Sequence, residues 1–251
     1  MDLGIAGRLA LVTGASRGIG RGIASALAAE GARLVLVSRS ASDLEEVRTS
    51  LPDPDSHAWV ALDLMEDEAA GELARRVTDL GDLDIVVQNL GGSNAVWGDT
   101  FSSSEDWYKV WKYNLGVAHE LNRQFIPPMI EKRWGRIVYL STLSTHTYKG
   151  YPAYVSAKCG LEGYVRTVSR VVAPHNVIMS AVSPGAIRVD GRHFAKLESE
   201  SPDALERYFD ESLPARRLGT PDDIGSVVAF LSSEHASFMV GSIVGIDGGG
   251  W

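Results

Sequence analysis

Cysteine is almost absent from this 251-residue sequence, in which Cys159 is the only one. One thiol excludes an internal disulfide and a metal site built from several cysteines, and it is typical of a reducing compartment. No apolar run reaches the roughly 18 residues of a membrane-spanning helix, and the N-terminus lacks the basic segment of a signal peptide. These absences predict a cytoplasmic protein that does not enter a membrane.

Positive charge is also scarce, since 24 lysines and arginines stand against 32 aspartates and glutamates and the formal net charge is -8. Such an acidic chain is a poor partner for nucleic acid or for an anionic membrane surface. The six histidines show no paired spacing of the kind that holds a metal ion, so we predict no metal site. A small molecule is therefore the expected partner, and local donors can still bind an anionic one.

Repeats, low-complexity tracts and linkers are missing too, which favours a single domain over residues 1–251. Short apolar runs alternate with longer amphipathic stretches, and most runs are rich in Val, Ile and Leu, as in strands buried on both faces of a parallel sheet. The pattern predicts an α/β fold, a doubly wound parallel sheet of about seven strands with helices on both faces. The expected strands span 8–13, 33–38, 58–63, 83–88, 136–141, 177–183 and 242–246, and the expected helices span 18–30, 42–50, 66–80, 103–131, 152–173 and 221–233.

A glycine-rich turn, Thr13-Gly14-Ala15-Ser16-Arg17-Gly18-Ile19-Gly20, lies between the first expected strand and the first expected helix. Gly14 permits a tight turn, and the later glycines let the backbone approach a pyrophosphate and the helix pack on the strand. The N-terminus of the following helix adds free N–H groups and a positive dipole. The turn therefore predicts nucleotide binding at the carboxyl edge of the sheet.

Tyr154 and Lys158 stand four residues apart in the expected helix 152–173, so their side chains share one helix face. A free phenol has a pKa of about 10, and a nearby ammonium favours the phenolate. The pair predicts a tyrosine whose pKa falls toward 7 and which can exchange protons. An ordinary helix with a half-buried tyrosine and a solvated lysine is the alternative.

Together the glycine turn and the Tyr-x-x-x-Lys pair resemble the short-chain dehydrogenase/reductase family over 7–249, nearly the whole chain. The resemblance implies a Rossmann-like fold and an oxidoreductase that transfers hydride between a nicotinamide cofactor and a carbonyl or secondary alcohol. It also implies a homotetramer or homodimer. The remaining assignments are carried over position by position.

The end of the second expected strand bears on which nicotinamide cofactor is used. A carboxylate there would accept from the ribose 2′-hydroxyl of NAD, but this chain has Ser38 followed by Arg39, with Arg17 in the glycine turn. Because arginine forks suit phosphate, we predict NADP(H) in preference to NAD(H). The family also implies that Asp63, next to Leu64, accepts from the adenine amine, although Asp63 could simply cap the helix that follows.

Two further strand ends complete the predicted cofactor site, each with a departure from the family pattern. Asn89 and Gly91 match the family's Asn-Asn-Ala-Gly, whereas Gln88 and Leu90 do not. Val189 stands where the family often has threonine, which leaves Arg188 or a backbone group to take that place. The predicted cofactor contacts are Gly14, Ser16, Arg17, Gly18, Ile19, Gly20, Ser38, Arg39, Asp63, Leu64, Asn89, Gly91, Tyr154, Lys158, Pro184, Gly185 and Ile187.

The catalytic set implied by the resemblance is Asn114, a hydroxyl residue, Tyr154 and Lys158. Tyr154 would exchange a proton with the substrate oxygen, and Asn114 would hold a water in a relay to Lys158. The hydroxyl residue has two candidates, because counting along the fifth strand gives Thr142 and counting back from Tyr154 gives Ser141. Side chains alternate along a strand, so one of the two faces the site, and we favour Thr142.

Residues 188–216 predict a mobile lid over the substrate, with a plain pair of surface helices as the alternative. Aromatic and polar side chains near the expected pocket would suit a sugar-like substrate; the predicted substrate contacts are Ser144, Asn94, Trp97, Tyr148, Tyr151 and His193. Two other functions stay open. One is a catalytically weak nucleotide-binding sensor or scaffold on the same fold, and the other is an isomerase or dehydratase that acts through a transient ketone.

Overall fold

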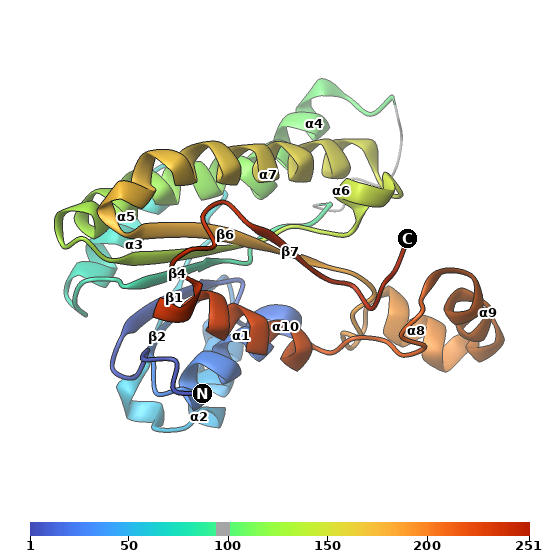
Figure 1. Ribbon diagram of the computed structural model, residues 1–251, viewed down its shortest axis with the longest axis horizontal. Helices are drawn as coiled ribbons and strands as arrows, with labels where there is room; N and C mark the ends of the chain where they lie inside the picture. Colours follow the sequence, from blue (N-terminus) through green and yellow to red (C-terminus); the bar gives the residue numbers. More distant parts are fainter. Residues whose placement is uncertain (94–100) are drawn as a thin grey trace.

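The computed structural model describes residues 1–93 and 101–251, and within them seven parallel strands form one sheet in the order β3-β2-β1-β4-β5-β6-β7 (Figure 1). The sequence therefore predicted the fold class correctly. The strands are β1 (Leu9–Thr13), β2 (Arg33–Ser38), β3 (Ala58–Ala61), β4 (Ile85–Gln88), β5 (Gly135–Leu140), β6 (Val177–Pro184) and β7 (Ile243–Ile246). Strand order reverses between β1 and β4, and ligands of open α/β sheets bind outside the strand ends at such a switch point.

Helices cover both faces of the sheet, as Figure 1 shows. Successive residues of β1 point to opposite faces, so Ala10 and Val12 pack in one buried cluster and Leu9 and Leu11 in the other. The first cluster lies under α1 (Gly18–Ala29), α2 (Ala41–Ser50) and α10 (Pro221–Leu231). The second lies under α3 (Ala69–Thr78), α5 (Val117–Glu131) and α7 (Pro152–Val172). Burial on both faces explains the apolar runs of the sequence.

The helix expected over 103–131 is interrupted. It consists of α4 (Ser104–Trp111), a π-helical turn (Lys112–Gly116) and α5. Asn114 lies in the π turn, where the regular i to i−4 hydrogen bonds of the backbone are lost. The sequence did not predict this interruption, which often marks a functional site.

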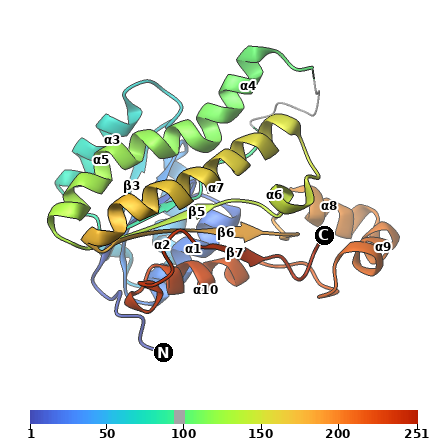
Figure 2. The same cartoon turned by 45° about the horizontal axis from the view of Figure 1, so that its top comes forward.

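Residues 188–216 contain two short helices, α8 (His193–Glu200) and α9 (Pro202–Ser212), which lie beyond the carboxyl ends of β6 and β7 (Figure 2). Phe194, Leu197, Tyr208 and Phe209 pack with a small buried cluster of their own. A four-residue helix, α6 (Ser144–Thr147), follows β5 and was not predicted. Among the described residues, none of the helices is both long and apolar enough to span a bilayer.

Candidate functional site

The glycine turn folds back on itself so tightly that there is no room for a side chain at Gly20. Gly14 and Gly18 have φ of 65° and 55°, a region that glycine adopts without strain. A Cβ on Gly20 would lie 2.1 Å from the carbonyl oxygen of Gly14. The Asn89 amide donates to the carbonyls of Thr13 and Gly14 at 2.9 and 3.1 Å, so the end of β4 holds this turn in place.

The departures from the family pattern beside Asn89 have their own contacts. The Gln88 amide nitrogen donates to Asn122 Oδ1 at 2.7 Å and to the Ala118 carbonyl at 3.3 Å, both on α5. The backbone N–H of Leu90 donates to Thr13 Oγ1 at 3.0 Å. Gln88 therefore braces α5 against the strand that carries Asn89, and the turn keeps its shape.

A cleft of about 640 Å³ runs along the strand ends from the glycine turn to β3. Arg17, Ser38, Arg39 and Asp63 line it. Arg39 Nη1 lies 3.7 Å from Asp63 Oδ2, and Asp63 Oδ1 accepts from the backbone N–H of Met65 at 3.0 Å. Because α3 begins only at Ala69, Asp63 does not cap that helix. The cleft contains the guanidinium groups of Arg17 and Arg39, and the N-terminus of α1, which has no side-chain cap, lies at its glycine turn. Both features fit an anionic dinucleotide.

The second cleft, of about 300 Å³, adjoins the first one and shares Ile19, Asn89, Gly91, Val189 and Arg192 with it. Its remaining lining residues are Leu140, Ser141, Thr142, Tyr154, Lys158, Pro184, Gly185, Ile187 and Phe194. A nucleotide that lay along the first cleft would therefore end beside Tyr154. We call this second cleft the catalytic pocket.

Two of the predicted catalytic groups meet at Gly91. A Cβ built on Gly91 would lie 2.8 Å from both Asn114 Oδ1 and Lys158 Nζ. Asn114 is 2% exposed, donates to the carbonyls of Gly92 and Val110 at 2.7 and 2.9 Å, and accepts from the Gly92 N–H at 2.9 Å. Lys158 is 3% exposed and donates to the Leu140 carbonyl at 2.6 Å. Its Nζ lies 5.9 Å from the centroid of the Tyr154 ring.

The two candidate hydroxyls after β5 have different partners. Ser141 Oγ donates to Glu162 Oε1 at 2.5 Å, whereas the Thr142 hydroxyl is hydrogen-bonded to the Tyr154 phenol. Ser141 is thus occupied by a carboxylate on α7, and Thr142 is the residue beside the tyrosine. The preference for Thr142 as the catalytic hydroxyl stays a prediction, and its contact with Tyr154 favours it.

Proton affinities in the catalytic pocket differ from the sequence-based prediction. Burial raises the pKa of Tyr154 above its ordinary value, and the interaction with Thr142 only partly opposes this. Burial also lowers the pKa of Lys158 to about 7, against the opposing charge of Glu162. The prediction that the Tyr154 pKa falls toward 7 is therefore wrong. Burial removes water from both side chains, which disfavours the charged phenolate and the charged ammonium alike.

The predicted substrate contacts are less well placed. Tyr148 is 77% exposed, and His193 is exposed at the start of α8. Ser144, the first residue of α6, and Tyr151, just before α7, are partly buried. None of these four is among the described residues that line the catalytic pocket. Asn94 and Trp97 lie outside the described residues.

Instead Arg192 and Phe194 line the catalytic pocket; both lie in the predicted lid 188–216 but were not among the predicted site residues. Arg188, which was one predicted substitute for the family's threonine beside a backbone group, does not line it, because its guanidinium pairs with Glu198 at 2.6 Å and Asp190 at 2.8 Å. The two acidic neighbours of Arg188 were visible in the sequence and could have excluded it.

The family described as enoyl-(acyl carrier protein) reductase matches residues 14–250 of this sequence. The chain belongs to the short-chain dehydrogenase/reductase family. It is 31% identical to the 3-oxoacyl-[acyl-carrier-protein] reductase FabG of Aquifex aeolicus, over 99% of both chains. This dehydrogenase/reductase is therefore an oxidoreductase by descent.

Solved structures give the same result for the fold. The short-chain dehydrogenase/reductase superposes with a TM-score of 0.90 on the 3-oxoacyl (acyl-carrier-protein) reductase of Agrobacterium tumefaciens with NADP bound, at 28% identity over 99% of this chain and 96% of that one. It superposes equally well, at 29% identity over 99% and 98%, on the L-sorbose reductase of Gluconobacter frateurii complexed with NADPH and L-sorbose. These relatives bind NADP(H).

Glu162 is a buried carboxylate of this dehydrogenase/reductase that the sequence did not single out. Its Oε1 accepts from Ser141 Oγ at 2.5 Å and from Thr145 Oγ1 at 2.8 Å. Because these residues flank Thr142, the carboxylate fixes the loop that carries the hydroxyl beside Tyr154.

Replacing this carboxylate should destabilise the protein. We expect Glu162→Ala to lower the free energy of unfolding by about 2–4 kcal/mol, since two buried hydroxyls lose a charged acceptor. Urea denaturation measures the change. The matched variant Glu162→Gln keeps an acceptor of similar size and should cost less, so equal losses in both variants would contradict the hydrogen-bond explanation.

Proposed function

We propose that this protein reduces a ketone carbonyl to a secondary alcohol at the expense of NADPH, with Tyr154 as the proton donor. The observation that carries the proposal is that Thr142, Tyr154 and Lys158 line the catalytic pocket where it adjoins the first cleft, which we call the dinucleotide cleft. Asn114 Oδ1 and Lys158 Nζ lie together beside Gly91, a residue that both clefts share. NADPH bound in the dinucleotide cleft would supply the hydride. The 2′-phosphate is assigned to Arg17 and Arg39, and Ser38 stands at the end of β2, where a carboxylate would repel it.

Each side chain has a separate role in the proposed reaction. The Thr142 hydroxyl holds the substrate oxygen beside the Tyr154 phenol, and Tyr154 passes its proton to that oxygen. Lys158 then returns a proton to the tyrosine, and a water held by Asn114 passes a proton from solvent to Lys158. A lysine whose pKa is about 7 both accepts and releases protons at neutral pH, which suits it to this relay.

The substrate class follows from the pocket and the relatives. Phe194 and Ile187 supply apolar walls, and the named relatives reduce 3-oxoacyl groups or L-sorbose. We therefore assign a small ketone and take residues 188–216 as the lid over it. We also assign a homo-oligomer, since Tyr108 and Trp111 of α4 are exposed aromatic side chains that association would cover.

The proposal is tested by following NADPH and NADH oxidation with acetoacetyl-CoA, a diketone and L-sorbose. We expect turnover of at least one ketone, faster with NADPH than with NADH. Binding of NADPH without turnover of any ketone would favour a nucleotide sensor. Product formation without net cofactor consumption would favour an isomerase or dehydratase.

Arg192 lies where its side chain could bind the cofactor and so hold the lid closed over it. Val189, three residues earlier, packs on the glycine turn, where a Cβ on Gly18 would lie 2.9 Å from Val189 Cγ1. The Arg192 N–H donates to the Val189 carbonyl at 3.0 Å, and Arg192 lines both clefts. We assign its guanidinium to the cofactor pyrophosphate, in place of the threonine that Val189 replaces.

Arg192→Ala should weaken the binding of NADPH and NADH by a similar factor, about tenfold, because both carry the pyrophosphate. Nucleotide fluorescence titration gives both dissociation constants. Arg39→Ala is the matched control and should weaken NADPH alone. A loss confined to NADPH in the Arg192 variant would place its guanidinium at the 2′-phosphate instead.

A further inference from the structure

Tyr113 lines the dinucleotide cleft but has no part in the function proposed above. It is partly buried and directly precedes Asn114 in the π turn. Both side chains lie against Gly92. Asn114 forms hydrogen bonds with the Gly92 backbone at 2.7 and 2.9 Å, and a Cβ built on Gly92 would lie 3.7 Å from Tyr113 Cε1. Two successive side chains of the π turn therefore contact the loop after β4.

At neutral pH the Tyr113 phenol keeps its proton and can donate it in a hydrogen bond. Burial raises its pKa above the ordinary value, and the charges of Arg39 and Arg192 oppose this only in part. Within residues 1–93 and 101–251 the hydroxyl makes no hydrogen bond. A neutral phenol donates to an anion, whereas a phenolate would repel it. Tyr113 therefore offers the dinucleotide cleft an unused donor.

The charges around this phenol favour a phosphate as the acceptor. The charged residues that line the dinucleotide cleft are Arg17, Arg39, Arg192, Asp43 and Asp63. After burial, Arg39 has the largest effect on the Tyr113 pKa, which indicates that the phenol lies on the side of the cleft where β2 ends. Arg39 Nη1 lies 3.7 Å from Asp63 Oδ2, a distance at which the pair leaves the guanidinium able to bind an anion as well.

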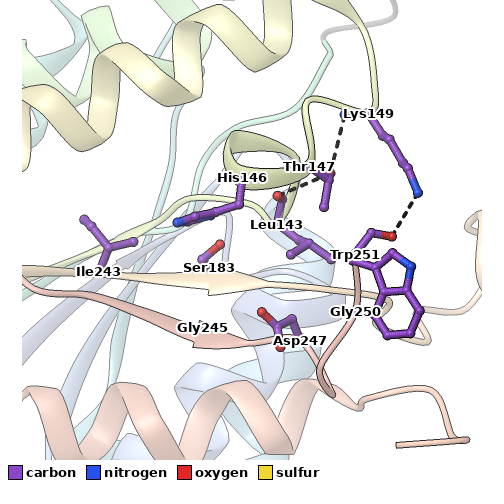
Figure 3. Close-up of a pocket in the computed structure, with 10 residues that line it drawn as sticks. All are labelled: Leu143, His146, Thr147, Lys149, Ser183, Ile243, Gly245, Asp247, Gly250 and Trp251. Atoms are coloured by element: carbon purple, nitrogen blue, oxygen red, sulfur yellow. Dashed lines mark hydrogen bonds between the residues drawn. The ribbon is translucent and has the colours of Figure 1, made fainter. Parts of the chain in front are cut away.

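The cavity of about 540 Å³ at the β7 edge of the sheet suits phosphate less well (Figure 3). Its charged lining residues are Lys149 and Asp247. The Lys149 ammonium already donates to the Trp251 carbonyl at 2.9 Å, and the carboxylate of Asp247 would repel an anion. An anionic nucleotide therefore meets several arginines in the dinucleotide cleft and a single, engaged lysine in this cavity.

We propose that Tyr113 is a specificity-determining residue, whose hydroxyl donates to the 2′-phosphate of NADP(H) beside Arg39. The inference rests on the proposed function, which places NADPH in the dinucleotide cleft. NAD(H) carries a neutral hydroxyl in place of this phosphate, and a hydrogen bond to an ionised acceptor is roughly twice as strong as one to a neutral acceptor. The bond would also tie the cofactor to the π turn that holds Asn114.

The test compares ligands that differ by this one phosphate. Calorimetric titration of the full-length protein gives the dissociation constants of NADPH and NADH, and of their fragments 2′,5′-ADP and 5′-AMP. Tyr113→Phe removes the hydroxyl and keeps the ring. We expect it to weaken NADPH and 2′,5′-ADP by about tenfold and to change NADH and 5′-AMP by less than about twofold. Tyr108→Phe is the matched control, since Tyr108 is exposed on α4 outside both clefts, and it should change none of the four constants.

Two results in Tyr113→Phe would overturn the assignment. One is unchanged binding of NADPH and 2′,5′-ADP. The other is a similar loss for all four ligands, which would mean that the hydroxyl shapes the cleft or binds a part common to both cofactors. These results are distinct from failure of the proposed function, because binding is measured without a ketone. Wild-type protein that bound neither NADPH nor NADH would overturn both proposals, whereas NADPH binding without turnover of any ketone would overturn the reduction alone.

Discussion

Tyr154→Phe should lower kcat for ketone reduction by about 10³-fold, since a positioned general acid contributes roughly 10²–10⁴. The phenol oxygen lies in the catalytic pocket beside Thr142, and phenylalanine keeps the ring while removing the only proton proposed to move to the substrate. The dissociation constant of NADPH should stay within about twofold, because the lost hydroxyl costs at most one weak hydrogen bond. Single-turnover kinetics and nucleotide titration separate the two quantities.

Tyr164→Phe is the matched control for this experiment. Tyr164 lies on the same helix α7, but its hydroxyl accepts from Asn122 at 2.9 Å, outside both clefts. We expect a small loss of stability and nearly normal turnover. If Tyr154→Phe kept substantial turnover, or if both variants lost activity alike, Tyr154 would not be the proton donor.

The sheet could be predicted from the sequence because its signal is local. Each strand is a short apolar run, and burial on both faces removes the alternation that an exposed face would impose. The π turn at Lys112–Gly116 could not be predicted in this way, since its residues fit a continuous amphipathic helix. The turn is marked by the side-chain hydrogen bonds of Asn114 to the backbone of Gly92, which is 22 residues away in the chain. Such a distant contact leaves no pattern in the local sequence.

The two candidates for the catalytic hydroxyl show the limit of counting residues along the sequence. Thr142 and Ser141 both fit the family spacing within one residue. Glu162 separates them, since it accepts from Ser141 at 2.5 Å from 21 positions further along the chain. A partner so distant has no signature in the spacing of the motif.

The electrostatic prediction failed for a related reason. The spacing of Tyr154 and Lys158 identified a pair of groups on one helix face, but their burial depends on what packs over that face. Both lie out of water, so desolvation outweighs the attraction that was expected from the pair alone. Because its pKa is about 7, Lys158 is partly uncharged at neutral pH. Burying its charged form costs stability, but a lysine that gains and loses a proton near pH 7 is suited to proton transfer.

Lys158→Met should therefore make the protein more stable while it abolishes reduction. The folded state holds the pKa of Lys158 at about 7 instead of its usual 10.5. At about 1.4 kcal/mol for each pKa unit, keeping this ammonium buried costs on the order of 4 kcal/mol at neutral pH and below. Methionine removes that cost but leaves the Leu140 carbonyl without its donor, an opposing loss of about 1–3 kcal/mol. The expected net gain is about 2 kcal/mol by urea denaturation at pH 7.

The pH dependence of this gain identifies its cause. Between pH 7 and pH 10.5 the unfolded wild-type lysine binds more protons than the folded one, so wild-type stability rises with pH through that window while that of Lys158→Met does not. The advantage of the variant should shrink by about 2 kcal/mol between pH 7 and pH 9. An advantage that stayed constant over this range would mean that better packing, and not the buried charge, is its origin.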